Sequence, residues 1–353
     1  MTDIQEKDNR IMILDIMKGV CICMVIVRHV GVIGPEMQKM YGWPFTVLPA
    51  VPMFLMMSMV SFSLAEERKG KDVDLLSWFE WETFSRRFCR FLLPFFIAVA
   101  VEIAILYLRG MKGFSLMSLF VMLQQGGRGP GNYYVIIVFQ LMLLFPFLRL
   151  FYKKNAAVTV LGLIFLNIVY ERFCIDTCLD QKLYYVLIFR YLTHLALGMI
   201  LYEYGKRLRQ TALPMLCMIT GIIYLVNLFY RDYHQVLVYG YPLRFMIPSL
   251  YSFGVLCYVF GLERYLQNTV KQSRNIRSLI SPVAYIGKAS WHIMLAQMVY
   301  FYFIRLDKLE KLIGPVWKVV LVDLVVSVIL GCLFYALDKK CRLVLKQRNE
   351  ITL

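Results

Sequence analysis

A run near the start of the chain combines apolar residues with side chains that can do chemistry. Residues 14–29 read LDIMKGVCICMVIVRH and include Asp15, Lys18 and His29. If this run is a helix, the eleven residues from Lys18 to His29 bring both side chains to one face, about 16 Å apart along the axis. Asp15 lies one turn before Lys18, near the same face. Ionisable groups in a membrane span are costly and usually mark function, so the pattern predicts a cation near one membrane edge and a base deep inside.

This layout suits a protein that moves a group across the bilayer. Histidine exchanges protons near neutral pH, so His29 is the best candidate for a base at the deep end. No Gly-x-Ser-x-Gly motif and no Ser-His-Asp arrangement is visible in the sequence.

The first helix is similar to that of a known family. Leu-Asp-x-x-Lys-Gly, with Lys18, ten residues and then His29, resembles the acyltransferase-3 family of integral-membrane enzymes that O-acylate surface glycans. The resemblance implies an O-acyltransferase that moves an acyl group, acetyl by family habit, from cytoplasmic acyl-CoA to a hydroxyl of an extracytoplasmic or lipid-linked glycan. His29 would then be the catalytic base that removes the hydroxyl proton, or a transient carrier that accepts the acyl group first and passes it on. The sequence leaves both routes open. Lys18 would assist it, and would pair with Asp15 or with a CoA phosphate, which places Asp15 in the substrate site.

Three arginines precede the third apolar segment of the chain. Arg86 and Arg90 share one helical face, and Arg87 lies beside Arg90. The family carries a similar cluster before a proline, which is Pro94 here. Arginine binds phosphates through two parallel hydrogen bonds, so the cluster is predicted to hold the phosphates of acyl-CoA. The alternative interpretation is a topology anchor at anionic lipid headgroups, and the sequence leaves both open.

Two further segments resemble parts of the family pattern. Residues 52–58 match Pro-x-Phe-x-x-x-Ser, with Met59 where a glycine is usual. Residues 286–297 match the late Gly-x-x-Ser-aromatic segment, with Gln297 where a histidine is frequent. His292 within that segment is expected to be a core histidine with satisfied hydrogen bonds.

Other polar groups in the apolar segments have two interpretations each. Arg190 and His194 are four residues apart and share a helical face. They form either a second polar wall of a cavity or, as we favour, a structural pair bonded to backbone or to an acid such as Glu102 or Asp323. The glycine-rich residues 126–132 lack the Gly-Lys-Ser/Thr ending of a phosphate loop, so we expect an extracytoplasmic turn there.

Loop residues give weaker signals. Trp78 and Trp81 stand beside charges, which suits a helix lying in the cytoplasmic interface. His234 is expected in a solvated loop. Cys174 and Cys178 could form a disulfide if their loop is extracytoplasmic, but the other cysteines are scattered through apolar runs and no metal site is predicted.

Composition identifies the class of protein. Of the 353 residues 59% are hydrophobic, whereas soluble chains are nearer half apolar. The net charge of +16 could suggest binding to nucleic acid, but the positive-inside rule for cytoplasmic loops of membrane proteins explains much of it. We expect one all-α integral-membrane domain over residues 1–353, multi-pass in a bacterial plasma membrane, with no resident cofactor and no soluble SGNH-type extension.

The apolar segments predict a polytopic bundle of about ten spans. Lys and Arg are concentrated in the loops on the N-terminal side, so both termini are predicted to be cytoplasmic. Residues 114–123 are too short to span and are expected to lie in the interface or to re-enter. The predicted spans are 12–33, 44–65, 88–109, 133–152, 156–171, 183–204, 212–230, 243–262, 281–304 and 315–336.

Two other classes of protein compete with the acyltransferase. A transporter or flippase for a glycan or lipid-linked sugar would also be polytopic and carry intramembrane charges. Transporters often consist of two related halves with broken helices in matching positions, and no such halves are visible here. A receptor or scaffold explains the basic loops but leaves the shared face of Lys18 and His29 without a purpose.

Overall fold

The fold is all-α, as the sequence predicts. In the computed structural model no strand occurs among the described residues, which are 11–31, 33–68, 78–110, 115–177, 181–231, 246–305 and 312–351. His234 and Cys178 lie outside these ranges, so the expectations for them stay predictions. The main helices are α2 (Met12–His29), α5 (Ala50–Glu67), α7 (Trp81–Leu108), α9 (Tyr133–Lys154), α10 (Ala156–Asp176), α12 (Leu192–Leu208), α13 (Leu213–Tyr230), α14 (Met246–Gly261), α15 (Glu263–Gln272), α16 (Arg274–Val299) and α18 (Val316–Ile351).

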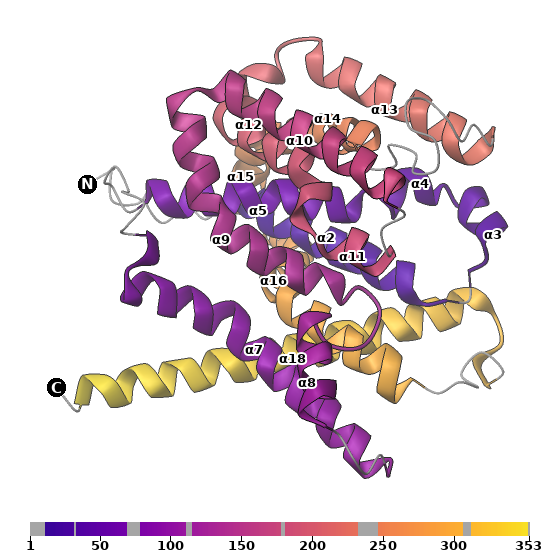
Figure 1. The fold of residues 1–353 in the computed structure, drawn as a ribbon, viewed down its shortest axis with the longest axis vertical. Helices are drawn as coiled ribbons and strands as arrows, with labels where there is room; N and C mark the ends of the chain where they lie inside the picture. Colours follow the sequence, from indigo (N-terminus) through magenta and orange to yellow (C-terminus); the bar gives the residue numbers. More distant parts are fainter. Residues whose placement is uncertain are drawn as a thin grey trace.

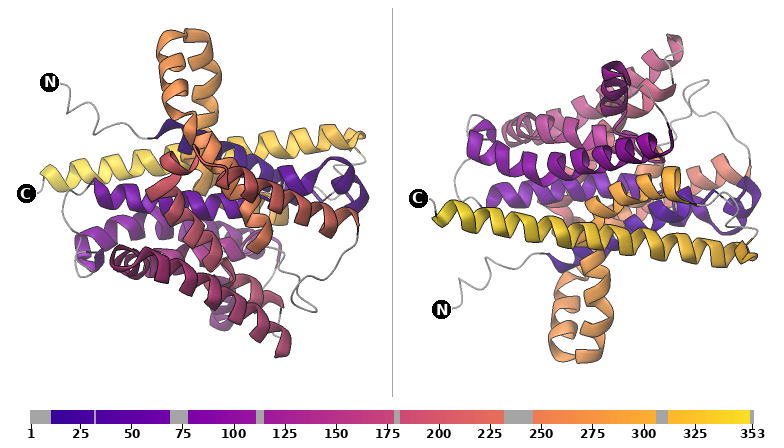
Figure 2. Two further views of the ribbon diagram at one scale, coloured as in Figure 1. Left: turned by 90° about the horizontal axis from the view of Figure 1, so that it is seen from above. Right: turned by 90° about the horizontal axis from the view of Figure 1, so that it is seen from below.

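Shorter helices connect these elements. They are α3 (Pro35–Met40), α4 (Trp43–Thr46), α8 (Leu116–Gln124), α11 (Gln181–Val186), the 3₁₀ helix η1 (Ile188–Tyr191) and the π-helix η2 (Tyr300–Ile304). In Figure 1 α2, α5 and α16 lie in the middle of the bundle, with α10, α12, α13 and α14 on one side of them and α7, α8 and α18 on the other. Figure 2 shows α15 and the first turns of α16 projecting from the bundle as a helical hairpin.

The described residues contain six helical segments that are long and apolar enough to cross a membrane. The helices α2 and α16 are not among them, because of the charged and polar side chains that they carry. The protein is therefore a polytopic helical membrane protein. The count of ten spans and the cytoplasmic termini stay predictions. The six segments are Trp43–Glu67, Phe84–Leu108, Tyr133–Lys154, Ala156–Cys174, Leu213–Tyr230 and Val316–Val344.

The central helices α2 and α16 cross at two glycines. A Cβ atom built on Gly287 would lie 1.7 Å from the backbone oxygen of Asp15, and one built on Gly19 would lie 2.3 Å from the backbone oxygen of Val283. No side chain fits in either place, so only glycine allows the two backbones to come this close. Lys18 and Lys288 each adjoin one of these glycines, and the crossing therefore fixes where both lysines stand.

Close packing of α5 against α12 depends on a different glycine from the one expected. Met59 stands where the family usually has glycine, yet α5 and α12 still come close, because Gly198 of α12 supplies the space. A Cβ at Gly198 would lie 2.8 Å from the Cβ of Met59 and 2.9 Å from the Cα of Met56. The small residue is on the partner helix instead.

The predicted sixth span, 183–204, is not one continuous helix. Leu187 is extended and separates α11 from η1, so the helix is broken just before Arg190. Gln140 of α9 makes this break tolerable, because its amide donates to the backbone oxygen of Val186 at 2.7 Å and accepts from the backbone N–H of Ile188 at 2.9 Å. Freed backbone groups inside a membrane protein need such partners.

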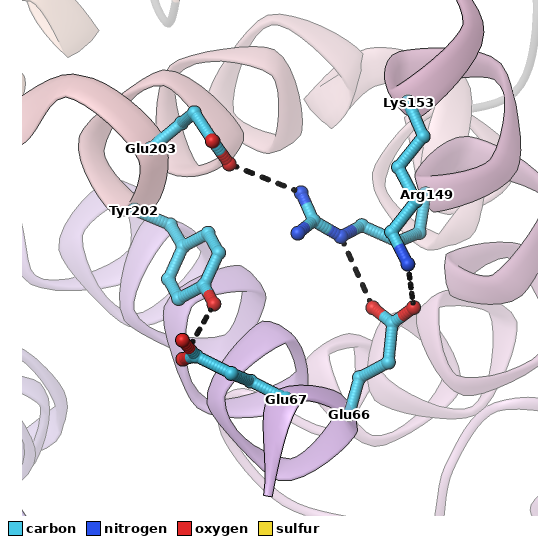
Figure 3. Close-up of polar contacts among 6 residues, drawn as sticks. All are labelled: Glu66, Glu67, Arg149, Lys153, Tyr202 and Glu203. Carbon is cyan, nitrogen blue, oxygen red and sulfur yellow. Dashed lines mark hydrogen bonds and ion pairs between the residues drawn. The ribbon is translucent and has the colours of Figure 1, made fainter. Parts of the chain in front are cut away.

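A buried ionic cluster joins α5, α9 and α12. Glu66 accepts hydrogen bonds from Arg149 at 3.0 Å and from Lys153 at 2.8 Å, and Arg149 also lies 3.6 Å from Glu203 (Figure 3). Beside it, Tyr202 donates to Glu67 at 2.8 Å. Glu66 is almost fully buried, so its two cationic partners are what makes its charge tolerable there.

Candidate functional site

A cavity of about 840 Å³ lies between the central helices and brings together most of the residues that the sequence singles out. It is lined by His29 and Lys18 of α2 and by all three arginines of the cluster, Arg86, Arg87 and Arg90. The predicted alignment of Lys18 and His29 on one face therefore agrees with their positions on one cavity wall. Further lining residues are Ser58, Ser61, Gly131, Tyr133, Tyr134, Tyr185, Arg190, Tyr191, Lys288, Trp291, His292, Met294, Asp338, Lys339 and Arg342.

Asp15 takes a different place from the other candidates. It is buried, with 3% of its surface exposed, and its backbone oxygen touches the helix crossing at Gly287. It does not line the cavity. Its predicted role in substrate binding stays a prediction, whereas its position at the crossing ties it to the packing of α2 on α16.

Lys18 is oriented by α5. Its Nζ donates a hydrogen bond to Oγ of Ser61 at 2.7 Å, and that hydroxyl donates to the backbone oxygen of Met57 at 2.7 Å. The start of α2 is fixed as well, because the carboxylate of Glu263 accepts the backbone N–H groups of Met12 and Ile13 at 3.0 and 2.7 Å. An acid at a helix N-terminus stabilises the free N–H groups there.

His29 is the last residue of α2, and the glycine-rich segment packs directly on it. A Cβ at Gly131 would lie 3.2 Å from Nε2 of His29, and Gly131 has a φ of +82°, which favours glycine. Asn132 closes the turn by donating to the backbone oxygen of Gly127 at 3.0 Å. Glu102 holds the turn from α7 by accepting the backbone N–H of Arg128 at 3.0 Å. The expected turn is thus also a wall of the site.

Gln297 also approaches the Gly131 turn, a position for which the sequence predicted no role. Its Nε2 lies 3.8 Å from the same Cβ position at Gly131, so the side chains of Gln297 and His29 converge on one point. Gln297 is fully buried, and within the described part of the chain its Oε1 has no hydrogen-bond partner. The available signal was its place in the late motif, at the position where the family often has a histidine.

The arginine cluster lies within α7, and its members differ in their surroundings. The guanidinium of Arg87 stacks on the ring of Trp78 at 3.1 Å and donates to the backbone oxygen of that residue at 3.4 Å. Trp78 itself is buried against Phe145, with ring centroids 4.9 Å apart, so its side chain is covered by protein, and the expected interfacial position of its helix stays a prediction. The indole fills the core and supports Arg87, whereas Trp81 is 80% exposed.

Helix α7 is tied to α16 next to the cluster. The indole N–H of Trp291 donates to the backbone oxygen of Phe91 at 3.1 Å, and the two rings meet edge to face. The guanidinium of Arg90 lies 5.5 Å from the centre of the Phe91 ring. These contacts place Arg90 at the same wall as the late motif.

His292 is buried and lines the cavity, and only one of its ring nitrogens has the hydrogen bond expected of a satisfied core histidine. Among the described residues its Nδ1 has no hydrogen-bond partner. Its Nε2 lies 2.9 Å from Oδ2 of Asp338, and Asp338 in turn accepts from Arg342, with the Nε–Oδ1 distance 3.0 Å. Asp338, Lys339 and Arg342 belong to the C-terminal part of α18, which the sequence predicted only as far as residue 336. The prediction missed them because they stand in a charged stretch that has no pattern of its own.

Arg190 and His194 are separated by the break in the helix. Arg190 lines the cavity, is buried, and its guanidinium lies 4.4 and 4.0 Å from the ring centres of Tyr184 and Tyr185. His194 is fully buried, does not line the cavity, and packs against the ring of Tyr191 at 5.9 Å. Arg190 thus has the cavity position that the functional interpretation required.

The two acids considered as partners of this pair lie elsewhere. Glu102 binds the glycine-rich turn, as described above. Asp323 accepts hydrogen bonds from Tyr300 at 2.7 Å and from Arg305 at 2.9 Å. The rings of Tyr184 and Tyr185 pack against the guanidinium of Arg190.

The charge of the cavity wall is strongly positive. Among the described residues that line it, nine are Lys or Arg and one, Asp338, is an acid. No group of three metal-ligating side chains gathers in this part of the chain. The wall can therefore hold a polyanion at one end, beside Lys18 and the arginines, and position a base, His29, farther along α2.

Comparison with known proteins identifies the family. A family model described as an acyltransferase domain matches residues 13–336, which is nearly the whole chain. The chain belongs to the acyltransferase-3 family. It is therefore a membrane acyltransferase, and the cavity between α2, α7 and α16 is its candidate active site. No curated protein and no solved structure matches the acyltransferase.

Proposed function

We propose that this acyltransferase moves an acyl group, expected to be acetyl, from cytoplasmic acyl-CoA to a hydroxyl of an extracytoplasmic or lipid-linked glycan. The observation that carries the proposal is that His29, Lys18 and the arginines of α7 line one cavity. A base and a polyanion site joined by one continuous space are what transfer from a nucleotide thioester to an alcohol requires.

The donor is proposed to bind at the end of the cavity that holds Lys18, Arg86 and Arg90. Phosphates bind arginine and lysine through charge-assisted hydrogen bonds, which are stronger than neutral ones. By the positive-inside rule this end faces the cytoplasm, where acyl-CoA is found. His29 lies about 16 Å from Lys18 along α2, so an extended pantetheine arm is needed to bring the thioester to the histidine.

The acceptor is proposed to enter from the other end of the cavity. Tyr133, Tyr185 and Tyr191 line that end together with Arg190. Aromatic faces with a few fixed polar groups are typical of small-molecule sites, and sugars present both apolar C–H faces and hydroxyls to them. The alcohol would reach His29 under the Gly131 turn.

His29 carries the proposed chemistry. Its imidazole takes the proton of the acceptor hydroxyl while the oxygen attacks the thioester carbonyl, and the proton then passes to the leaving CoA thiolate. In the second route the imidazole attacks the thioester first, releases CoA, and passes the acyl group to the alcohol. Both routes break one C–S bond, form one C–O bond and give free CoA and an acyl ester.

The test compares three histidine and lysine variants of the purified protein. Release of CoA from acetyl-CoA, in the presence of membrane glycan, is measured per folded molecule. We expect His29→Ala to lower turnover about 10²–10⁴-fold without loss of CoA binding, and Lys18→Ala to act mainly on donor KM. His194→Ala is the control, because this histidine is buried but outside the cavity.

Near-normal turnover of folded His29→Ala would refute the proposed role of this residue. A wild-type protein that neither binds nor consumes acyl-CoA would refute the proposed donor, and the transporter or flippase would then be the reading to test.

A further inference from the structure

We infer that the C-terminal part of α18 forms a second half of the donor site, in which Lys339 and Arg342 bind the phosphates of the CoA nucleotide together with the arginines of α7. The inference rests on the proposed function, because it takes acyl-CoA as the donor. The two residues lie beyond residue 336, where the match to the family model ends, so the family assignment says nothing about them.

Arg342 is held in position before any ligand arrives. Asp338 accepts hydrogen bonds from its Nε at 3.0 Å and from its Nη2. Asp338 is fixed in turn to α16 through Nε2 of His292 at 2.9 Å, and both of these side chains are buried. The two hydrogen bonds to Asp338 use Nε and Nη2 of Arg342. The side chain of Arg342 is 31% exposed, which leaves it accessible to a ligand in the cavity.

His292 and Asp338 therefore have a purpose beyond satisfying each other. A buried carboxylate on a cavity wall is costly and would repel a phosphate. Its two bonds to Arg342 neutralise it, and its bond to His292 fixes the distance between α18 and α16. The result is a preorganised arginine, and preorganisation lowers the entropy that binding must overcome.

The charges of the cavity wall suit a ligand with several phosphates. The nucleotide of CoA carries a diphosphate and a phosphomonoester. Lys288, Lys339 and Arg342 line the same cavity as Arg86 and Arg90, and Asp338 is the single acid among its described lining residues. Arginines on α7 alone would meet the nucleotide from one wall, whereas the cations of α16 and α18 add a second wall from elements that are far away in sequence.

The next residue along α18 provides a matched control. Lys340 carries the same charge as Lys339 and is exposed, but it does not line the cavity. Lys339→Gln and Lys340→Gln therefore remove the same charge. They differ in that Lys339 lies on the helix face toward the cavity and Lys340 does not. Both side chains are exposed, so neither change is expected to unfold the protein.

The experiment measures binding of CoA to the full-length purified protein by titration calorimetry. We expect Lys339→Gln and Arg342→Gln each to weaken binding about ten-fold, as loss of a charge-assisted bond does, and Lys340→Gln to leave it unchanged. Turnover is then measured with acetyl-CoA and with acetyl-pantetheine, which lacks the nucleotide. The variants should differ from wild type in KM for acetyl-CoA only.

Three other outcomes distinguish failure of this inference from failure of the proposed function. Failure of the wild type to bind CoA would overturn the proposed donor itself. Normal CoA binding by Lys339→Gln and Arg342→Gln, in a wild type that does bind CoA, would overturn only the second half of the donor site. If Lys339→Gln instead loses affinity for phosphatidylglycerol added in detergent micelles, with CoA binding unchanged, the basic residues of α18 bind lipid headgroups and the inference is wrong.

Discussion

Replacing Gly287 by alanine tests whether the crossing of α2 and α16 holds the site together. The new Cβ would lie 1.7 Å from the backbone oxygen of Asp15 and 2.9 Å from the backbone nitrogen of Gly19. Both neighbours are backbone atoms of a helix, so no side chain can turn away. Contact distances between such atoms are above 3 Å, and the helices must therefore separate by roughly 1.5 Å at this point.

The separation should affect both stability and catalysis. Forcing an extra carbon into a closely packed contact costs about 1–3 kcal/mol, occasionally more. Lys18 and Lys288 adjoin the crossing, and α16 also carries Trp291 and His292 into the cavity. A misplacement of about 1 Å in such a site can lower the rate about 10²-fold. Gly287→Ala should thus be less stable and much less active per folded molecule.

Gly162→Ala is the matched control. Gly162 lies inside α10, and a Cβ built there meets no atom within 4 Å. The change should be neutral or stabilise the helix by up to about 1 kcal/mol, because alanine is the better helix former. Thermal unfolding in detergent and CoA release are measured for both variants. Wild-type stability and turnover in Gly287→Ala would show that the crossing is not as close as described and would refute the reasoning.

Two further predictions concern the ionic cluster and the topology. Glu66→Gln should lower the free energy of unfolding by about 1–3 kcal/mol, because Arg149 and Lys153 lose a buried anionic partner. Glu67→Gln is the control and should have little effect, because Glu67 is exposed. Equal thermal midpoints of the two variants would contradict this prediction. In a background with Cys89 and Cys178 replaced by serine, exposed Cys341 should react with an impermeant maleimide only after cells are permeabilised, because the end of α18 is predicted to be cytoplasmic. Labelling of Cys341 in intact cells would reverse the proposed orientation of the donor site.

Local sequence was sufficient for the class of fold and for the residues on α2. Apolar runs of membrane length predict helices without tertiary information, because the bilayer forces each span to satisfy its own backbone. Within one helix, spacing alone decides which side chains share a face, and Lys18 and His29 do line one cavity wall. The family pattern identified Arg86, Arg87 and Arg90 for the same reason, since it too is a local spacing.

Features that depend on contact with a second helix could not be predicted from the sequence. The helix break at Leu187 depends on Gln140, more than forty residues earlier, and the core position of Trp78 depends on Phe145. Neither partner carries a local signal. The local sequence around an aromatic residue does not show whether it lies at the membrane interface or in the protein core. The difference lies in which other part of the chain covers the ring.

The sequence by itself determined that the protein is a helical membrane protein and that Lys18 and His29 share a face. Only the tertiary structure decided what meets them: the Gly131 turn and Gln297 at His29, and the basic residues of α18 in the cavity of the arginines. The physical reason is the crossing of α2 and α16 at Gly19 and Gly287. Two glycines far apart in sequence set the distance between the backbones, and the side chains of both helices that line the cavity are positioned by that contact.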